Sequence, residues 1–306
     1  MTAFQRAYRL NIGSIDIDAR AGVGLNALRV AFSVERDVKR QPNNCEIRVY
    51  NLTRAHRAEL AKLSSVRVRL EAGYVGDLGT IFDGDLRTAR TRREGPDLVT
   101  CASAGDGETQ CRIARINRTF AAGTPVDTVL RELGKALGAG AGNLEQFHGR
   151  HLLNGSQRIS RALTLSGPVY DELEFFCRSC GLRWSVQDSA LQLRDAGLPV
   201  GDRQGPLLRP DTGLIGEVQV ETVVAGAEKV HGLVKDSKTL RGEGFTAGTT
   251  KVTGVSLLRP DLIPGTAFRV ESQAFTGNLV CVATTHVGDS HSTDQWSVEW
   301  TGRPYK

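Results

Sequence analysis

The sequence lacks any apolar run long enough to cross a membrane, and its first residues, MTAFQRAYRLNIGS, contain no apolar signal core. We therefore expect a chain that neither spans a bilayer nor leaves the cell through the general secretory pathway. Acidic and basic residues alternate throughout, so the net charge of +5 favours solubility over a nucleic-acid-binding stripe. Aromatic residues make up only 6% and methionine occurs once, whereas 34 glycines indicate a turn-rich, β-rich fold.

The common catalytic and nucleotide-binding motifs are also missing. The chain has no P-loop, no GxGxxG followed by an acidic residue, no GxSxG and no HExxH. We therefore expect a protein without enzymatic activity, with no catalytic, cofactor-binding or metal-binding residues and no cofactor.

The nearest approach to a metal site lies close to the C-terminus. His286 and His291 flank a turn, with Asp289 and Asp294 nearby. Histidines on opposite sides of a turn do not share one face as an i, i+4 helical pair does, and the residues between them are ordinary hairpin-turn chemistry. The pattern favours a turn over a metal site.

Paired carboxylates for glycoside hydrolysis need not be adjacent in sequence, so they must be considered separately. The closest candidates are Asp171, Glu172 and Glu174. The helix expected there makes them a solvated face. A cell-wall hydrolase is therefore the less favoured alternative.

Six cysteines are present, at Cys45, Cys101, Cys111, Cys177, Cys180 and Cys281. In a chain that is not secreted, they are best interpreted as buried, reduced thiols. Cys177 and Cys180 form a CxxC, but a zinc site needs further ligands and no second pair lies at a suitable spacing. The pair ends a predicted helix rather than beginning one, which favours a structural role over redox chemistry.

An arginine cluster, Arg87, Arg90, Arg92 and Arg93, lies at one predicted hairpin tip. A solvated loop is favoured over a surface that faces a partner or DNA, because charge is scattered elsewhere in the chain. What these arginines contact stays open at this point.

A three-strand pattern occurs twice, once near each end of the chain. The first copy covers 66–74, 80–90 and 96–105, and the second covers 267–275, 278–290 and 295–302. Apolar and polar residues alternate in each stretch, and short polar loops join the stretches, as in half-buried antiparallel strands. In the last stretch, Trp296, Val298 and Trp300 are predicted to face one way, and Ser297, Glu299 and Thr301 the other.

Other elements follow from periodicity and turn residues. Strands are predicted at 28–34, 45–52, 182–186, 190–195, 217–223 and 229–234, and helices at 53–63, 123–138 and 167–181. A chain of 306 residues should hold two or three domains. The pattern predicts domains at 1–106, 107–210 and 211–306, with an α+β middle domain between two mainly β ends.

The order and spacing of short motifs resemble those of phage tail baseplate hub proteins. In the N-terminal region, these motifs lie within the stretch that begins with CEIRVYNLTRAHRAEL and ends with CASAGDGE. They are Val49-Tyr50-Asn51-Leu52, Ala72-Gly73-Tyr74, Ile81-Phe82-Asp83-Gly84 and Gly105-Asp106-Gly107. Towards the C-terminus they are Thr212-Gly213-Leu214-Ile215-Gly216, Leu257-Leu258-Arg259-Pro260, Pro264-Gly265 and His286-Val287-Gly288-Asp289. The middle region shares only a helix–helix–hairpin plan with the family, and Cys177 and Cys180 fall where apolar residues would be expected.

The resemblance implies a mainly β fold with an α+β insert, in which two tail-tube-like β-barrel domains flank a helix-containing middle region. Hub proteins of this kind look like homotrimers whose two barrels per subunit form a pseudo-sixfold ring. Such a ring adapts the hexameric tail tube to a threefold central spike and forms part of the DNA-ejection channel. Edge-to-edge pairing around a closed ring leaves no sheet edge exposed.

The resemblance also implies partners and a location. The partners would be further copies of the chain, the tail tube or distal tail protein and the central spike. The tape-measure protein's C-terminus and the baseplate wedge proteins are further candidates, and DNA would pass transiently through the lumen. The chain would belong to the virion's tail baseplate and assemble in the bacterial host cytoplasm. A hub module of a related contractile injection or secretion machine stays open as an alternative, because the same barrels serve both.

Overall fold

The computed structural model describes residues 5–22, 27–39, 41–60, 66–107, 112–140, 142–144, 158–195, 198–200, 204–222, 249–293 and 295–305. The chain divides by its contacts into two compact units. The first unit comprises Met1–Val38, Asn43–Gly105 and Arg203–Lys306, and the second comprises Lys39–Pro42 and Asp106–Asp202. The two end regions of the sequence therefore share one unit, whereas the predicted division into three domains stays a prediction.

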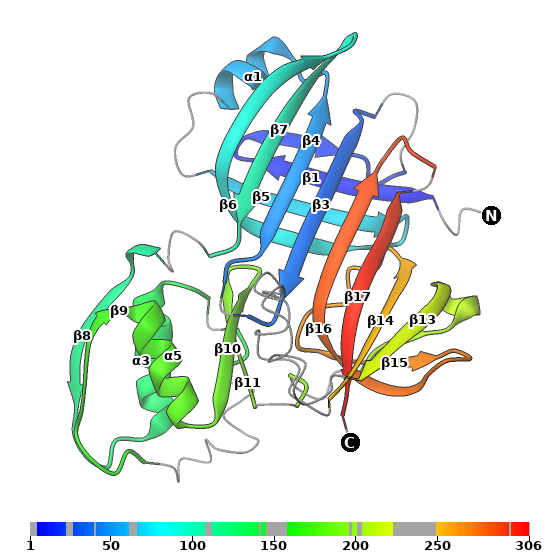
Figure 1. Ribbon diagram of the computed structural model, residues 1–306. Helices are drawn as coiled ribbons and strands as arrows, with labels where there is room; N and C mark the ends of the chain where they lie inside the picture. The colour runs from blue at the N-terminus through cyan, green and yellow to red at the C-terminus, as the bar shows by residue number, and fades with distance from the viewer. Residues whose placement is uncertain are drawn as a thin grey trace, which may run out of the picture. The chain divides into compact units, whose positions relative to one another are not determined.

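The first unit is built almost entirely of strands (Figure 1). Its N-terminal elements are β1 (Arg6–Ile12), β2 (Ile15–Asp18), β3 (Val30–Asp37), β4 (Asn44–Tyr50), α1 (Arg54–Leu60), β5 (Arg67–Tyr74), β6 (Asp77–Glu94) and β7 (Asp97–Gly105). Its C-terminal elements are β12 (Gln204–Leu208), the short helix η1 (Pro210–Thr212), β13 (Leu214–Thr222), β14 (Thr250–Leu257), β15 (Ala267–Glu271), β16 (Thr276–Asp289) and β17 (Trp296–Pro304).

These strands form one sheet of 13 strands, in the order β13-β14-β17-β16-β3-β4-β7-β6-β5-β1-β2, with β15 also paired to β16 and β12 paired to β15. Every pairing is antiparallel except that between β12 and β15. Both predicted three-strand stretches are antiparallel meanders, β5-β6-β7 and β15-β16-β17. They are joined through β3 and β4, so the two ends of the sequence make one continuous sheet.

Alternation of side chains explains why these segments are strands. In β17 the predicted facing is correct, because Trp296, Val298 and Trp300 are buried and the residues between them are half-buried or exposed. Edge-to-face ring contacts fix two of these aromatics. Phe32 packs on Trp296 at 5.4 Å between ring centroids, and Phe268 packs on Trp300 at 5.2 Å. One hydrophobic core thus lies mainly in the N-terminal region and takes in Trp296 from β17, and a second core surrounds Val298 and Trp300.

The second unit has a core of its own between helices and short strands. Its elements are β8 (Arg115–Phe120), α3 (Val126–Leu137), β9 (Leu163–Pro168), α5 (Val169–Ser179), β10 (Leu182–Gln187) and β11 (Ala190–Asp195). The predicted hairpin around 187–189 is present, since Asp188 and Ser189 both take positive φ values of 52° and 60°, as a tight hairpin turn requires. Trp184, buried in this core, donates a hydrogen bond from Nε1 to Glu174 at 3.0 Å.

The predicted mainly β fold with an α+β middle region is confirmed. Closure of either end region into a barrel stays a prediction. The strand expected at 229–234 lies outside the described residues, and β14, which pairs with β17, was not predicted. Within the part of the chain that the structure describes, no helix is both long and apolar enough to cross a membrane.

Candidate functional site

The pairing of β3 with β16 joins the two end regions, and we call it the internal joint. The two strands run antiparallel, with Val34 opposite His286 and Glu35 opposite Thr285. Val34 is fully buried there, and the Arg36 side chain is also buried, donating a hydrogen bond from Nη1 to the Ile81 carbonyl at 3.2 Å. The internal joint therefore combines apolar contact with a polar seam.

His286 belongs to this seam, where the backbone of another segment holds its ring. Its side chain is completely buried, and Nε2 lies 3.0 Å from the Arg259 carbonyl oxygen. Burial, together with the nearby Arg36 charge, lowers the pKa of His286 to about 4, so the imidazole is neutral. Because a carbonyl oxygen can only accept a hydrogen bond, the neutral ring carries its proton on Nε2 and leaves Nδ1 unprotonated.

The other residues of the imagined metal site are engaged elsewhere. Asp289 forms an ion pair with Arg29 at 2.6 Å, and His291 Nδ1 lies 2.9 Å from the Ser290 hydroxyl. Burial works against ionisation of Asp289, yet hydrogen bonds from Arg29 and the His291 backbone hold its pKa below the usual range. Asp294 lies outside the described residues. Among the described residues there is no group of three or more side chains suited to a metal ion.

Strand edges without a partner within the described residues lie on β2, on β12, on β13 and along the second half of β6, and we call the last two the open edges. One is the second half of β6, which pairs with β7 on one side only. The other is β13, which pairs only with β14. Unpaired N–H and C=O groups along a strand edge are a template for another strand, so both edges are candidate assembly sites.

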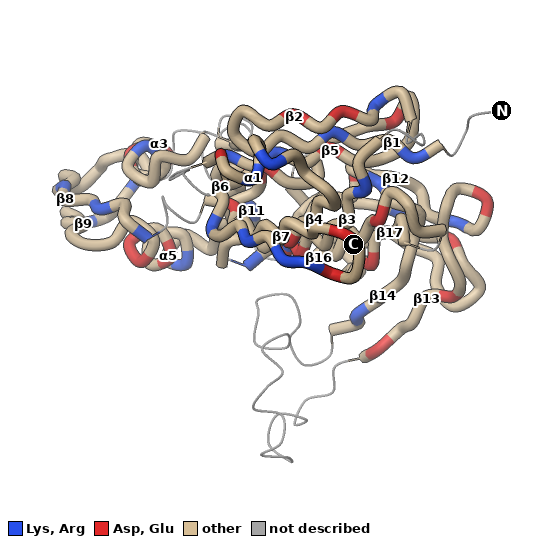
Figure 2. The backbone as a smooth tube through the Cα atoms, turned by 90° about the horizontal axis from the view of Figure 1, so that it is seen from above, with Lys and Arg blue, Asp and Glu red and all other residues tan. Residues whose placement is uncertain are grey.

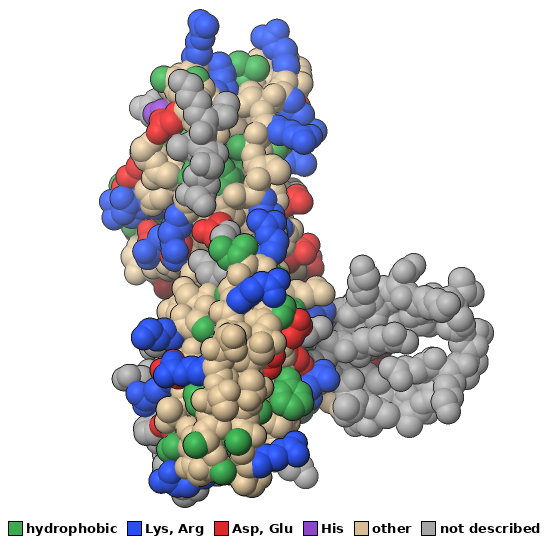
Figure 3. All heavy atoms as spheres, turned by 90° about the vertical axis from the view of Figure 1, so that its left-hand side faces the viewer, with side chains coloured by type: hydrophobic (Ala, Val, Ile, Leu, Met, Phe, Trp, Pro, Cys, Tyr) green, Lys and Arg blue, Asp and Glu red, His purple; other side chains and the backbone are tan. Residues whose placement is uncertain are grey.

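The four arginines of the sequence cluster lie along the first of these edges. The structure corrects their predicted position, because they belong to the strand β6 itself and not to a solvated loop. All four side chains are exposed; Arg87 donates to Asn44 at 2.8 Å and Arg92 pairs with Glu94 at 2.6 Å. In Figure 3, basic side chains gather at the top of the view, where α1 and the β6–β7 hairpin lie in Figure 1.

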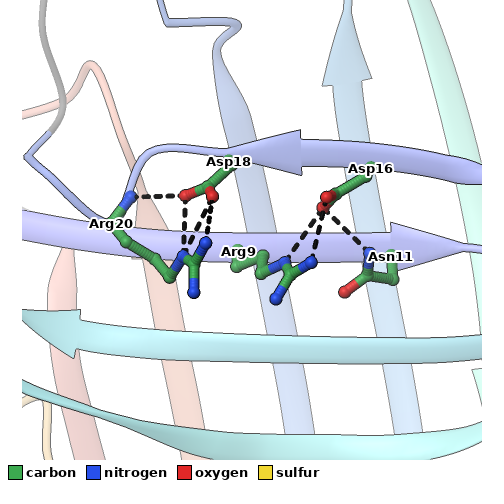
Figure 4. Close-up of polar contacts among 5 residues, drawn as sticks. All are labelled: Arg9, Asn11, Asp16, Asp18 and Arg20. Carbon is green, nitrogen blue, oxygen red and sulfur yellow. Dashed lines mark hydrogen bonds and ion pairs between the residues drawn. The ribbon is translucent and has the colours of Figure 1, made fainter.

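A third edge, β2, is protected instead (Figure 4). This strand has only four residues, and both of its outward carboxylates are taken up locally. Asp16 accepts two hydrogen bonds from Arg9, and Asp18 accepts hydrogen bonds from Arg20 that lower its pKa to about 2. A very short edge strand offers few unpaired backbone groups to another chain. The β2 edge is therefore a poor assembly site, in contrast to the two open edges.

The face of the sheet that turns away from the two cores is the polar face. It is hollowed over β13, β14, β16 and β17, where a depression of about 280 Å³ is lined by residues that include Gln219, Thr253, Thr285, Glu299 and Thr301. Figure 2 shows the charged positions interspersed along the strands, with acidic positions on β13 and a basic one on β14. The lining of this depression thus offers hydroxyls and carboxylates.

The cysteines fit structural roles. Cys45, Cys177 and Cys281 are buried, while Cys101 and Cys180 are half-buried. Burial raises the pKa of Cys281 to about 12 and also raises the pKa of Cys180, so neither thiol is activated as a thiolate. Cys111 lies outside the described residues.

The prediction that Asp171, Glu172 and Glu174 form one solvated face is wrong in part. Glu174 is held by Trp184 and by Arg178, and Glu172 accepts a hydrogen bond from the Ser166 backbone N–H at 3.1 Å. Of the three, only Asp171 is exposed. The Trp184 contact could not be predicted from the sequence, because a hydrogen bond between a helix and a following strand depends on tertiary packing.

The fold is similar to that of solved phage tail proteins and of a type VI secretion component. Over 98% of both chains, it superposes on the 43 kDa tail protein of prophage MuSo2 from Shewanella oneidensis with a TM-score of 0.62 and 9% identity. A tail protein from Neisseria meningitidis MC58 gives a TM-score of 0.60 at 10% identity, covering 98% of this chain and 97% of that one.

A third neighbour is a type VI secretion component from E. coli that is itself structurally similar to the T4 bacteriophage tail proteins gp27 and gp5. It gives a TM-score of 0.56 at 12% identity over 97% of this chain and 77% of that one. No family model and no curated protein sequence matches the chain. The resemblance to phage tail hub proteins is therefore confirmed at the level of the fold.

Proposed function

We propose that the chain is a structural baseplate hub of a phage tail. In this role three copies form a ring that adapts the hexameric tail tube to the threefold central spike and forms part of the DNA-ejection channel. The partners are the tail tube or distal tail protein and the spike, with the tape-measure C-terminus and the baseplate wedge proteins as further contacts. The protein acts in the virion after assembly in the host cytoplasm, and it has no enzymatic activity.

The observation that carries this proposal is the internal joint between two similar parts of one sheet. The chain already pairs one end region with the other through β16 and β3, and it leaves one open edge in each end region, along β13 and along the second half of β6. A contact between two different edges is heterologous, and it generates a closed ring when the rotation per copy closes. Three copies with two end regions each supply six docking places for a hexameric tube.

The chemistry of the polar face supports a role as channel wall. Tight, sequence-independent binding of DNA requires Lys and Arg contacts to many phosphates. The polar face carries carboxylates at Glu35, Glu46 and Glu299 together with exposed Arg48, Arg90 and Arg92, so charges of both signs alternate there and no continuous basic stripe is presented to DNA. A wall of this kind lets DNA pass through the lumen without stopping.

A hub module of a contractile injection or secretion machine is the second candidate. The neighbours include the type VI secretion component and a chain of a Francisella PdpA–VgrG complex, which gives a TM-score of 0.54 at 8% identity and covers 98% of this chain and 58% of that one. The mechanical role is the same in both cases, and the genes next to this one distinguish them.

Coexpression with the spike and tube proteins of the same gene cluster tests the proposal. Mass photometry of the purified complex should give three copies of the chain per spike trimer. A chain that stays strictly monomeric with both partners present would overturn the hub assignment. Clearing of a peptidoglycan suspension by the purified chain would instead favour the hydrolase alternative.

A further inference from the structure

The duplication in this chain extends beyond the two meanders to five strands in each end region. The N-terminal region follows the order β3-β4-β7-β6-β5, and the C-terminal region follows β13-β14-β17-β16-β15. Each strand of the first series therefore has a counterpart in the second. The internal joint connects β16 to β3, so its counterpart would connect β6 to β13. Both of these strands carry an open edge.

A β-bulge fixes the register between the two long middle strands. Pairing of β6 with β7 shifts by one residue between Leu86 and Thr88, and pairing of β16 with β17 shifts between Cys281 and Ala283. Each shift leaves one extra residue in the long strand. Aligning the extra residue of β6 with the extra residue of β16 makes Thr91 the counterpart of His286. The alignment preserves the facing of the strands. The Thr91 side chain contacts that of Thr100 on the neighbouring strand β7, and His286 in the same way lies opposite Val298 on β17.

Rows of paired residues fix the register of the first strands in the same way. In one end region, Val34 pairs with Cys45, which pairs with Ala104. In the other, Val220 pairs with Val252, which pairs with Gly302. Ala104 and Gly302 each pair with the residue that directly precedes the bulge in the long strand, Leu86 in β6 and Cys281 in β16. Val220 is therefore the counterpart of Val34.

We infer that β6 of one copy pairs antiparallel with β13 of a second copy, with Thr91 opposite Val220 and Arg90 opposite Glu221. This arrangement repeats the internal joint, in which His286 lies opposite Val34 and Thr285 lies opposite Glu35. The inference rests on the proposed ring and specifies which surfaces close it. Because the two edges differ, every copy uses both of them, one towards each neighbour.

Exposure of the side chains agrees with this pairing. Val34 is completely buried at the internal joint, whereas its counterpart Val220 is 45% exposed in the single chain. An apolar side chain at the equivalent position is left open because its partner strand belongs to another copy. Pairing with β6 would cover Val220 and continue the hydrophobic core across the contact.

Charge also selects this partner. Arg90 is exposed and makes no ion pair within the described residues, while Glu221 is 65% exposed with only a 3.7 Å contact to Lys251. Opposite charges that face each other across neighbouring strands stabilise the pair, and like charges destabilise it. A β6 edge facing another β6 edge would oppose arginines, so the charges favour the head-to-tail contact.

Disulfide trapping in the assembled complex tests the register. A Thr91→Cys/Val220→Cys variant should form covalent trimers, and nothing larger, on mild oxidation, because paired residues lie within disulfide reach. Mixing the two single variants should give covalent dimers only. An Arg93→Cys/Thr222→Cys variant is the matched control, since both positions are exposed on the same face but stand about 13 Å out of register.

The outcomes separate this inference from the proposed function. The wild-type chain, oxidised in parallel, sets the background from the native thiols, and circular dichroism confirms that each variant folds. A trimer by mass photometry without covalent links, or with equal links in the control variant, would overturn the register and leave the hub assignment standing. A chain that never forms a trimer would overturn both.

Discussion

The strands β16 and β6 occupy the same place in the two end regions but meet different surroundings. Along the internal joint, β16 presents Thr285 and Val287 on the polar face, next to β3. At the same two positions, β6 presents Arg90 and Arg92, both exposed. An edge that is paired within the chain can carry small neutral side chains. An edge that waits for a second copy needs charge, because charged side chains keep an unpaired strand from aggregating.

The largest expected effect lies in the core of the C-terminal end region. Val298 is fully buried, so Val298→Asp would place an unpaired charge there and cost several kcal/mol. We expect loss of the cooperative thermal transition of this region, measured by circular dichroism. Ser297→Asp, on the polar face, is the control and should melt close to the wild type. Unchanged melting of Val298→Asp would show that the facing of β17 is wrong.

The stability of the protein should depend more on side-chain size at the internal joint than at the open edge of β6. A Cβ added at Gly288 would lie 2.3 Å from the Phe32 ring, which is held against Trp296. Gly288→Ala should therefore destabilise the protein by about 1–3 kcal/mol. Arg93→Ala, at the counterpart position on the open edge, should change the stability by less than about 0.5 kcal/mol. Equal effects in urea unfolding would contradict the description of β16 as a packed, paired strand and of β6 as an open edge.

Acid should weaken the internal joint through His286. Its pKa is about 4 in the fold and about 6.5 when unfolded, so the unfolded state takes up protons first as the pH falls. The stabilisation is thus present above pH 6.5 and is lost between about pH 6.5 and 4, by a few kcal/mol. Urea unfolding of wild type and His286→Gln at pH 7 and pH 4.5 measures the difference. A wild type that loses no more stability than the variant would contradict the buried neutral imidazole.

The smallest effect is expected for Arg90 and Glu221, the exposed residues that face each other across the contact between two copies. Arg90→Glu would set two acidic groups opposite each other and weaken trimer formation by about 0.2–1 kcal/mol per contact. Glu221→Arg in the same chain should restore assembly. Sedimentation at a series of protein concentrations gives the midpoint of assembly for each variant. A double variant that assembles no better than Arg90→Glu would argue against the pair.

Sequence alternation was enough to find both meanders and the facing of β17. It could not find that the meanders belong to one sheet, because the pairing of Val34 with His286 joins segments far apart in the chain. The strand β14 was missed because glycine and threonine interrupt its apolar pattern, with Gly254 required where the Trp300 ring lies 2.4 Å from any added Cβ. Local patterns predict strands, whereas neighbours in a sheet depend on long-range packing.

The arginine cluster shows the same limit at the candidate site. Four arginines within seven residues were visible in the sequence, but loop and strand could not be distinguished from charge alone. The structure places them on β6, and their meaning comes from the comparison with β16. The contact with β13 could not be predicted from the sequence, since it required both registers to be known.

An image of the assembled particle tests the central claim most directly. Electron microscopy of the tail, with the chain marked by a small fused tag, should show three tags at one level, at the end of the tube next to the spike. The ring at that level should have six similar lobes from three chains. Six tags in that ring, or tags placed on fibres or along the tube, would contradict the account.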